Sequence, residues 1–135
     1  MILVAENDVK VREKLVELLH CNGYIAEGTA VDAQLQGFVD KIRPALLVAG
    51  VSLHKESEEF RFVKSLTEST VIQGIPLLLA VETVIPEKSG VRKMNIEQIC
   101  CDSYCDKPID VYEFIDKVRM FVHAVPVSAE EADDE

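Results

Sequence analysis

The residues best able to do chemistry lie after two short apolar runs. Glu6, Asn7 and Asp8 follow residues 1–5, and Lys107 follows residues 102–106. This first turn is acidic and lacks glycine, so it would repel an anionic cofactor rather than cradle its phosphates. No nucleophile stands in a recognisable pairing with a base, which predicts that the chain is not an enzyme. We expect the Lys107 ammonium to pair with Glu6 or Asp8, or to extend towards solvent.

Cysteines and histidines add reactive side chains without forming a site. The cysteines are Cys21, Cys100, Cys101 and Cys105. They lack a second spaced Cys or His pair, so we expect neither zinc nor a disulfide framework, and we interpret them as buried reduced thiols. The histidines are His20, His54 and His123. They are scattered along the chain, and we expect structural or surface roles for all three.

Length and charge restrict the class of protein. A chain of 135 residues with 48% hydrophobic residues suits one domain with a formed core, and its net charge of −10 disfavours binding to nucleic acid. Half of that charge comes from five acidic residues within 130–135, which we interpret as a solvated tail or linker. No apolar run is long enough to span a membrane, and no secretion signal follows Met1, so we predict a cytoplasmic location.

Hydrophobic periodicity places these residues on alternating strands and helices. Strands are predicted at 1–5, 24–29, 44–53, 75–81 and 102–106. Helices are predicted at about 8–22, 31–42, 57–70 and 110–123. Asp8 or Asn7, Ser57 and Asp110 are suitable caps, and Asp110 with Glu113 has the spacing of a capping box. Residues 82–100 fit a helix only loosely, after a long loop marked by Pro86 and Gly90.

Five repeats of strand and helix indicate a parallel sheet covered by helices on both faces. At this length the expected fold is α/β and flavodoxin-like, a three-layer α/β/α domain with strand order 2-1-3-4-5. We predict one domain over 1–123 and an acidic tail over 124–135. In this topology the carboxyl ends of strands 1, 3, 4 and 5 lie together. They deliver Glu6 and Asn7, Gly50, Val81 and Lys107.

Four segments in this order resemble the motifs of response-regulator receiver domains from bacterial two-component signalling. They are Ile2–Asp8, Arg43–Leu53, Ile75–Val81 and Asp102–Pro108. The resemblance covers residues 1 to about 123. It implies that two acids after the first strand bind Mg²⁺ and that an aspartate ending the third strand accepts phosphate from a histidine kinase. It also implies that a Thr or Ser after the fourth strand and a Lys after the fifth contact the phosphoryl group.

This chain departs from that pattern at three of the five positions. Glu6 and Lys107 are retained, whereas Asn7 replaces the second acid, Gly50 stands at the acceptor position and Val81 replaces the hydroxyl residue. The resemblance also implies a cis bond before Pro108. Phosphoryl transfer needs an acceptor oxygen, which glycine lacks, and valine cannot donate a hydrogen bond. Glu6 with Asp8 should bind Mg²⁺ poorly, so we expect neither a metal nor a cofactor.

Other residues could replace parts of the lost machinery. Ser52 would be an alternative acceptor, but its hydroxyl would need a base and a metal that this turn does not supply. A two-residue shift would make Thr83 the switch hydroxyl, without restoring an acceptor. Two alternatives therefore stay open: a conventional receiver phosphorylated at a non-standard residue, and a flavodoxin-like domain that binds a small ligand.

The resemblance also implies where such a domain would act. Its usual output and dimer face consists of the fourth helix, the fifth strand and the last helix, which would present Tyr104, Tyr112, Glu113 and Arg119. Tyr104 matches the aromatic residue that swings inward on activation in many receivers. We predict a phosphorylation-independent receiver-like module that acts by protein–protein interaction. A histidine kinase or an output domain is the expected partner, and a homodimer is also open.

Overall fold

The part of the chain that the structure describes forms one sheet of five parallel strands between two layers of helices. The computed structural model describes residues 1–52, 57–82, 99 and 101–122. The strands are β1 (Ile2–Ala5), β2 (Ala26–Thr29), β3 (Leu46–Ser52), β4 (Leu77–Glu82) and β5 (Ser103–Asp106). Their order is β2-β1-β3-β4-β5, and every neighbouring pair is parallel. The predicted flavodoxin-like topology is confirmed.

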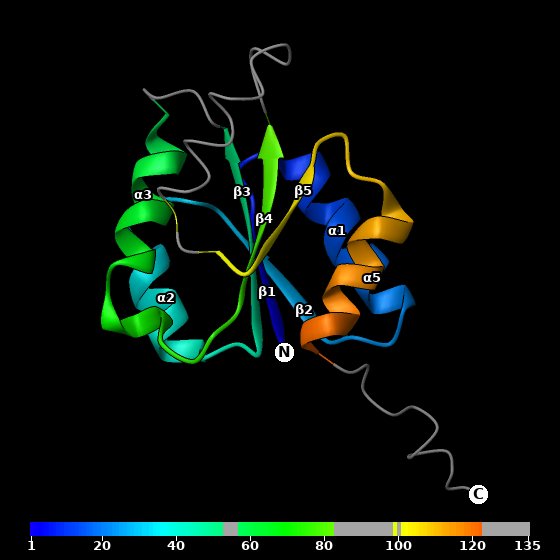
Figure 1. Ribbon diagram of the computed structural model, residues 1–135, viewed down its shortest axis with the longest axis horizontal. Coiled ribbons are helices and arrows are strands. Elements are labelled where there is room, and N and C mark those ends of the chain that lie inside the picture. Colours follow the sequence, from blue (N-terminus) through cyan, green and yellow to red (C-terminus); the bar gives the residue numbers. More distant parts are fainter. Residues whose placement is uncertain (53–56, 83–98, 100, 123–135) are drawn as a thin grey trace, which may run out of the picture.

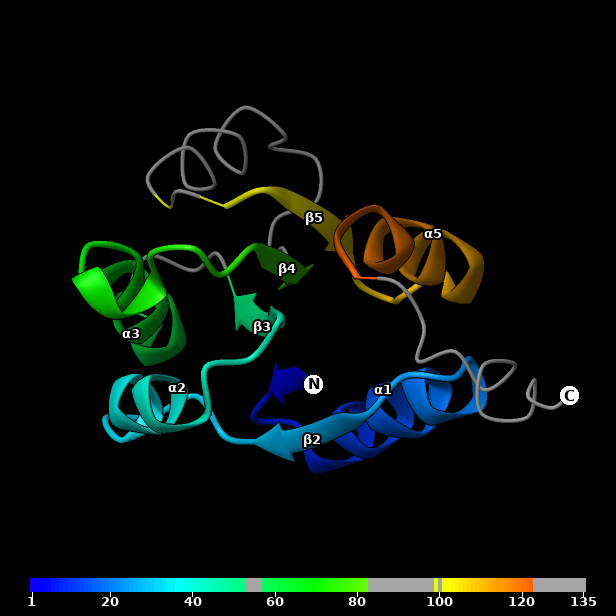
Figure 2. The ribbon, with the colours of Figure 1, turned by 90° about the horizontal axis from the view of Figure 1, so that it is seen from below.

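Helices cover both faces of this sheet. They are α1 (Val9–Cys21), α2 (Leu35–Ile42), α3 (Glu58–Thr67) and α5 (Val111–Phe121), with a 3₁₀ turn η1 (Thr70–Ile72) after α3. Helices α2 and α3 lie on one face and α1 and α5 on the other (Figure 1). The view from below shows the same two layers with the sheet between them (Figure 2). None of the helices described here is long and apolar enough to cross a membrane.

The core has two parts because side chains alternate along each strand. Leu3, Leu47 and Leu79 point towards α2 and α3, where they pack with Val39 and Val63. Their sequence neighbours point to the opposite face and pack with α1 and α5. Burial on both faces explains why β1, β3 and β4 read as continuous apolar runs in the sequence.

The predicted helix caps are largely confirmed. Asp8 accepts from the backbone N–H groups of Lys10 and Val11, and Ser57 accepts from that of Phe60. Asp110 likewise caps α5 through two backbone N–H groups. The reciprocal half of the capping box is wrong, because the Glu113 carboxylate pairs with Lys117 at 3.1 Å, one turn further along the helix.

Most predicted boundaries differ from the structure by one to three residues, and the start of α2 differs by four. Helix α2 begins at Leu35 rather than 31, because the backbone N–H and C=O of Val31 both bond to the side chain of Asn7. Strand β2 begins at Ala26 rather than 24 and lies at the sheet edge, as expected. The end of α2 matches the prediction: Arg43 has a left-handed backbone (φ 53°) and Pro44 follows.

The cysteine prediction holds only in part. Cys105 is buried, but Cys21 is exposed at the end of α1 and Cys101 is partly exposed. Burial raises the pKa of the Cys105 thiol to about 11. His20 is exposed, as predicted, and a ring nitrogen lies 3.0 Å from the carbonyl oxygen of Ala26.

Several predictions concern parts of the chain outside the described residues. They are those for Cys100, His54, His123, Thr83, most of the predicted 82–100 segment and the 124–135 tail.

Candidate functional site

Glu6 is the buried charged residue at the carboxyl end of the sheet. It directly follows β1 and is only 2% exposed. Its Oε1 lies 2.9 Å from Nζ of Lys107, and its Oε2 accepts a hydrogen bond from the backbone N–H of Asp8 at 3.0 Å. Apart from that ion pair, Oε1 has no well-aligned hydrogen bond to the described residues. A carboxylate removed from water is therefore stabilised by one ammonium and one backbone donor.

Gly50 forms the floor beneath this carboxylate. It lies in β3, next to β1, where Ala49 pairs with Ala5. A Cβ on residue 50 would lie 1.9 Å from Oε1 of Glu6 and 2.7 Å from its Cδ. Such distances are impossible for real atoms, so any larger residue here would have to displace the carboxylate. The side chain of Glu6 occupies the space that a side chain of residue 50 would need.

Lys107 brings β5 to the same point. Its side chain is 16% exposed, against 3% for that of Glu6, so the pair is largely removed from solvent. The backbone N–H of Lys107 donates to the carbonyl of Val81 at 2.8 Å, and the peptide bond to Pro108 is cis, as the resemblance implied. The predicted ion pair is present with Glu6 as its acid. It is more buried than a surface ion pair, so the ~0.5–1 kcal/mol typical of exposed pairs does not apply.

The Asn7 side chain bonds directly to two other segments and is linked to a third through Glu59. Its Oδ1 accepts from the backbone N–H of Val31 at 2.7 Å, and its Nδ2 lies 3.2 Å from the carbonyl oxygen of the same residue. Nδ2 also donates to Oε2 of Glu59 at 3.0 Å, and Oε1 of Glu59 accepts from the backbone N–H of Ser52 at 3.2 Å. An amide can donate and accept at once. An aspartate at this position would meet both a carbonyl and a carboxylate.

Asp8 and Val81 contribute to the site mainly through their backbones. The Asp8 carboxylate caps α1, and its N–H holds Glu6. The Val81 side chain is buried on the α3 side of the sheet, together with Val51 and Phe60, and its carbonyl holds Lys107. Of the six residues predicted here, Glu6 contacts Lys107, lies over Gly50 and accepts from the Asp8 backbone. Val81 contacts Lys107 through its carbonyl, whereas Asn7 bonds to other segments.

Mg²⁺ in proteins is bound by carboxylate and water oxygens, usually by one or two carboxylates with phosphate. Here the buried carboxylate of Glu6 already faces the Lys107 ammonium. Asp8 is exposed, and its Oδ1 accepts two backbone N–H groups of α1. Within the described segments, no three His, Cys, Asp or Glu side chains gather as metal ligands would. A divalent cation would have to displace Lys107 to reach Glu6.

The four predicted output residues divide into two groups along β5 and α5. Tyr104 is partly buried against the α2–α3 side of the core. Lys117 of α5 donates to its carbonyl, lies 5.6 Å from its ring centroid and pairs with Glu113. Tyr112 is 80% exposed at the first turn of α5. Arg119 is exposed near the other end of the helix, 3.5 Å from Asp116. The fourth helix of the predicted face lies outside the described residues.

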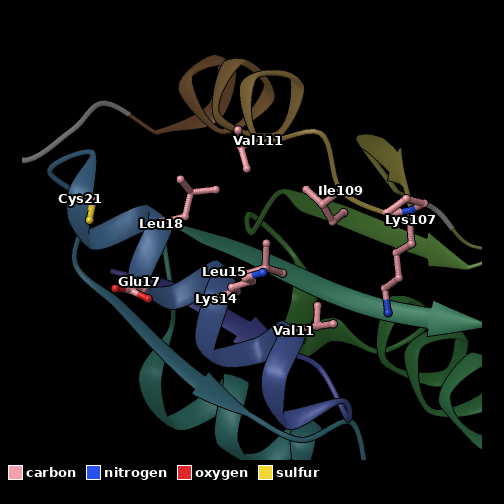
Figure 3. A pocket seen from close by; sticks show the side chains of 10 residues that line it. Val11, Lys14, Leu15, Glu17, Leu18, Cys21, Lys107, Ile109 and Val111 are labelled. Carbon is pink, nitrogen blue, oxygen red and sulfur yellow. The ribbon is translucent and has the colours of Figure 1, made fainter.

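A groove of about 520 Å³ lies between α1 and the start of α5. Figure 3 shows Val11, Leu15 and Leu18 of α1 facing Ile109 and Val111, with Lys107 at one end of the row and Cys21 at the other. The wall formed by Lys107, Pro108 and Ile109 is the same segment that ends at the ion pair with Glu6. The groove and the crevice at the strand ends therefore share Lys107.

Three residues of this region escaped the sequence analysis. Glu59 and Lys117 lie on helices, where their charges read as ordinary solvated faces. Arg12 donates from Nη1 to the carbonyl of Glu6 at 3.1 Å. It lies across β2 at Gly28, where a Cβ would be 2.8 Å from its Cγ. In the sequence, Arg12 is marked only by its helical spacing from the acidic turn and by Gly28, a glycine within a strand.

Comparisons with known proteins support the architecture. No family model matches the sequence, and no curated protein matches it. Among solved structures, the chain is similar to the receiver domain of a signal transduction histidine kinase from Syntrophus aciditrophicus. The TM-score is 0.71 at 19% identity, over 93% of this chain and 92% of the other.

Two further structures give similar values. The chemotaxis protein CheY4 of Vibrio cholerae has a TM-score of 0.68 at 18% identity, over 90% of this chain and 97% of its own. A response regulator receiver protein from Pseudomonas putida has a TM-score of 0.68 at 17% identity, over 88% of this chain and 94% of its own. Identities this low establish shape and leave function open. The chain has the flavodoxin-like fold that response-regulator receiver domains share.

Proposed function

We propose that this chain is a receiver-like signalling module of a two-component type pathway that acts by protein–protein interaction and without phosphorylation. The fold, shared with receiver domains, supports the signalling class. The observation that carries the proposal is the position of Glu6 above Gly50, where a side chain of residue 50 would overlap the carboxylate. The position that the resemblance assigns to the acceptor has no oxygen to phosphorylate, and its space is filled.

The polar groups around this point support the same reading. Glu6 faces Lys107, Asn7 is bound to Val31 and Glu59, and Asp8 caps α1. Each group that the resemblance would assign to Mg²⁺ or phosphate thus has a partner within the chain. Recruiting a metal would mean breaking a buried ion pair, which costs about 3–5 kcal/mol when one partner is left behind. We therefore propose that the contacts in the crevice hold β1, β5 and their neighbouring segments together and do not bind a metal.

The surface of α5 is the proposed site of contact with other proteins. Tyr112 and Met120 are 80% and 72% exposed, eight positions apart on this helix. Positions i and i+8 lie close to one face of a helix, and Asp116 and Arg119 add charge beside them. A kinase, an output domain or a second copy of the chain are the proposed partners. The cytoplasmic location and the lack of enzymatic activity stay predictions from the sequence.

Phosphorylation is tested by incubating the purified chain with acetyl phosphate and Mg²⁺ and measuring its intact mass. We expect no added phosphoryl group, while a receiver domain with an acceptor aspartate, treated in parallel, gains one. A stable phosphoryl adduct on this chain would contradict the proposal. Peptide mapping would then decide whether Ser52 or another residue accepts it.

The interaction surface is tested by comparing Tyr112→Ala with Ile25→Ala. Both residues are exposed and large, but Ile25 precedes the opposite edge strand, β2. We expect Tyr112→Ala to weaken self-association measured by sedimentation, or capture of a cognate kinase or output domain, with Ile25→Ala unchanged. Equal behaviour of the two variants would exclude the α5 face. Tyr104→Ala is less decisive, because this residue also packs against the core.

A further inference from the structure

The buried carboxylate of Glu6 is held as a bound anion would be. Its receptor comes from three other positions: the Lys107 ammonium at 2.9 Å, the Asp8 backbone N–H at 3.0 Å and the side-chain-free floor at Gly50. Lys107 and Asp8 are far apart in sequence, and both bond to this carboxylate. The Arg12 guanidinium binds the backbone carbonyl of Glu6 and adds a second cation nearby.

This receptor would be costly without an anion. Lys107 is 16% exposed, so removing the carboxylate leaves a largely desolvated ammonium and a backbone donor without its acceptor. Desolvated charges and unpaired donors are each unfavourable. Glu6 makes these contacts through its two carboxylate oxygens, and its methylene groups connect the carboxylate to β1. A free carboxylate could therefore make the same contacts without the covalent connection.

We propose that the crevice is a small-carboxylate binding site closed by its own Glu6 side chain. The internal carboxylate fixes Lys107, and Lys107 fixes the Pro108–Ile109 wall of the groove between α1 and α5. Occupancy of the crevice and the shape of the groove are thereby linked. If a protein partner recognises the groove in this fixed shape, that recognition rests on the proposed function. The carboxylate site itself does not.

Chemical rescue of Glu6→Ala tests the site. The substitution removes a methylene and a carboxylate, and acetate returns the same groups without the tether. We measure thermal unfolding of the full chain at pH 7 in sodium acetate and in sodium chloride of equal ionic strength. Acetate should raise the melting temperature of Glu6→Ala saturably, by roughly 4 to 7 °C at about ten times its dissociation constant. The wild-type chain should show no difference between the two salts.

Two controls isolate the receptor. Glu6→Ala/Lys107→Met should lose the acetate effect because the cation is gone. Glu59→Ala, which removes another acid at this end of the sheet, should show none. If Glu6→Ala is unfolded in chloride, the folded fraction measured by circular dichroism in each salt gives the same test.

Equal behaviour of Glu6→Ala in acetate and chloride would overturn the inference, as would rescue that survives loss of Lys107. Stabilisation by inorganic phosphate without stabilisation by acetate would contradict a carboxylate site. These outcomes do not depend on partner binding at α5. A failed rescue therefore leaves the proposed function standing, and a failed interaction test leaves the carboxylate site standing.

Discussion

The crevice at the strand ends and the surface formed by α1 and α5 lie next to each other but differ in how their groups are satisfied. In the crevice, Glu6 and Lys107 meet at 2.9 Å and Asn7 bonds to Val31 and Glu59. On the helical side, Tyr112 and Met120 are largely exposed, and an apolar groove of about 520 Å³ lies between α1 and the start of α5. The polar groups of the crevice are bonded to other groups of the chain, whereas the α1 and α5 surface exposes apolar side chains.

This difference shows how a sheet end can be stable without a ligand. When charged groups at a strand end contact only water or a ligand, the stability of that end depends on the ligand. When they form an ion pair within the chain, it does not. Apolar side chains left on a surface helix gain most by burial against another protein. In this chain the strand ends are held by internal contacts, and α5 is the surface that we propose for interaction.

The largest expected effect comes from breaking the buried ion pair. Lys107→Met leaves the Glu6 carboxylate desolvated and without its cation, which should lower the free energy of unfolding by about 3–5 kcal/mol at pH 7. Glu6→Gln/Lys107→Met removes both charges and should recover most of the loss. Urea unfolding measures both. Lys64→Met, which breaks an exposed pair with Glu68, should cost under about 1 kcal/mol. A similar small loss for Lys107→Met would mean that the crevice is as hydrated as the surface.

The next effect comes from overfilling the crevice. Gly50→Ala places a methyl group where Oε1 of Glu6 lies, 1.9 Å from the new Cβ, and should destabilise the chain by about 1–3 kcal/mol. In a Glu6→Ala background the same change should cost far less, because the overlapping atoms are gone. Gly37→Ala is the matched control: nothing lies within 4 Å of its added Cβ, and alanine favours helix. Loss of stability in Gly50→Ala that is independent of residue 6 would refute the contact.

A smaller effect should follow from Asn7→Asp. The new carboxylate keeps the bond from the Val31 N–H, but it faces the Val31 carbonyl and the Glu59 carboxylate without a proton to donate. Because Asn7 is exposed, we expect a loss of about 0.5–1 kcal/mol at pH 7, read from urea midpoints. Adding Glu59→Gln should restore stability. If Asn7→Asp instead stabilises the chain when Mg²⁺ is added, the crevice has kept a metal-binding capacity that we do not expect.

Cys21 at the end of α1 and Cys105 in β5 should also differ in thiol reactivity, with no effect on stability at neutral pH. Cys21 is exposed and lines the groove, so it should react quickly with a thiol reagent, whereas Cys105 is buried and should react only on unfolding. Burial raises the pKa of Cys105 from its ordinary value of 9.0 to about 11 in the folded chain. Stability from this group is thus complete below pH 9.0 and is lost as the pH rises to about 11. Urea midpoints from pH 7 to 10 should fall less in Cys105→Ala.

Much of the fold follows from local patterns that the sequence displays directly. The apolar runs of β1, β3 and β4 and the caps Asp8, Ser57 and Asp110 are short-range features, so they were predictable. The start of α2 was not, because it depends on a bond between Val31 and a side chain 24 positions away. The exposure of Cys21 was missed for a related reason, since the packing of α1 against other elements decides it.

The same division applies to the site. Residue 50 has no side chain, and Glu6 and Lys107 reach the same edge of a parallel sheet; residue type and strand direction were enough to predict both. That the Glu6 carboxylate lies over Gly50 and that Asn7 binds Glu59 became evident only from the folded chain. These contacts depend on side-chain directions and on distances of a few ångströms between separate segments, which no linear pattern encodes.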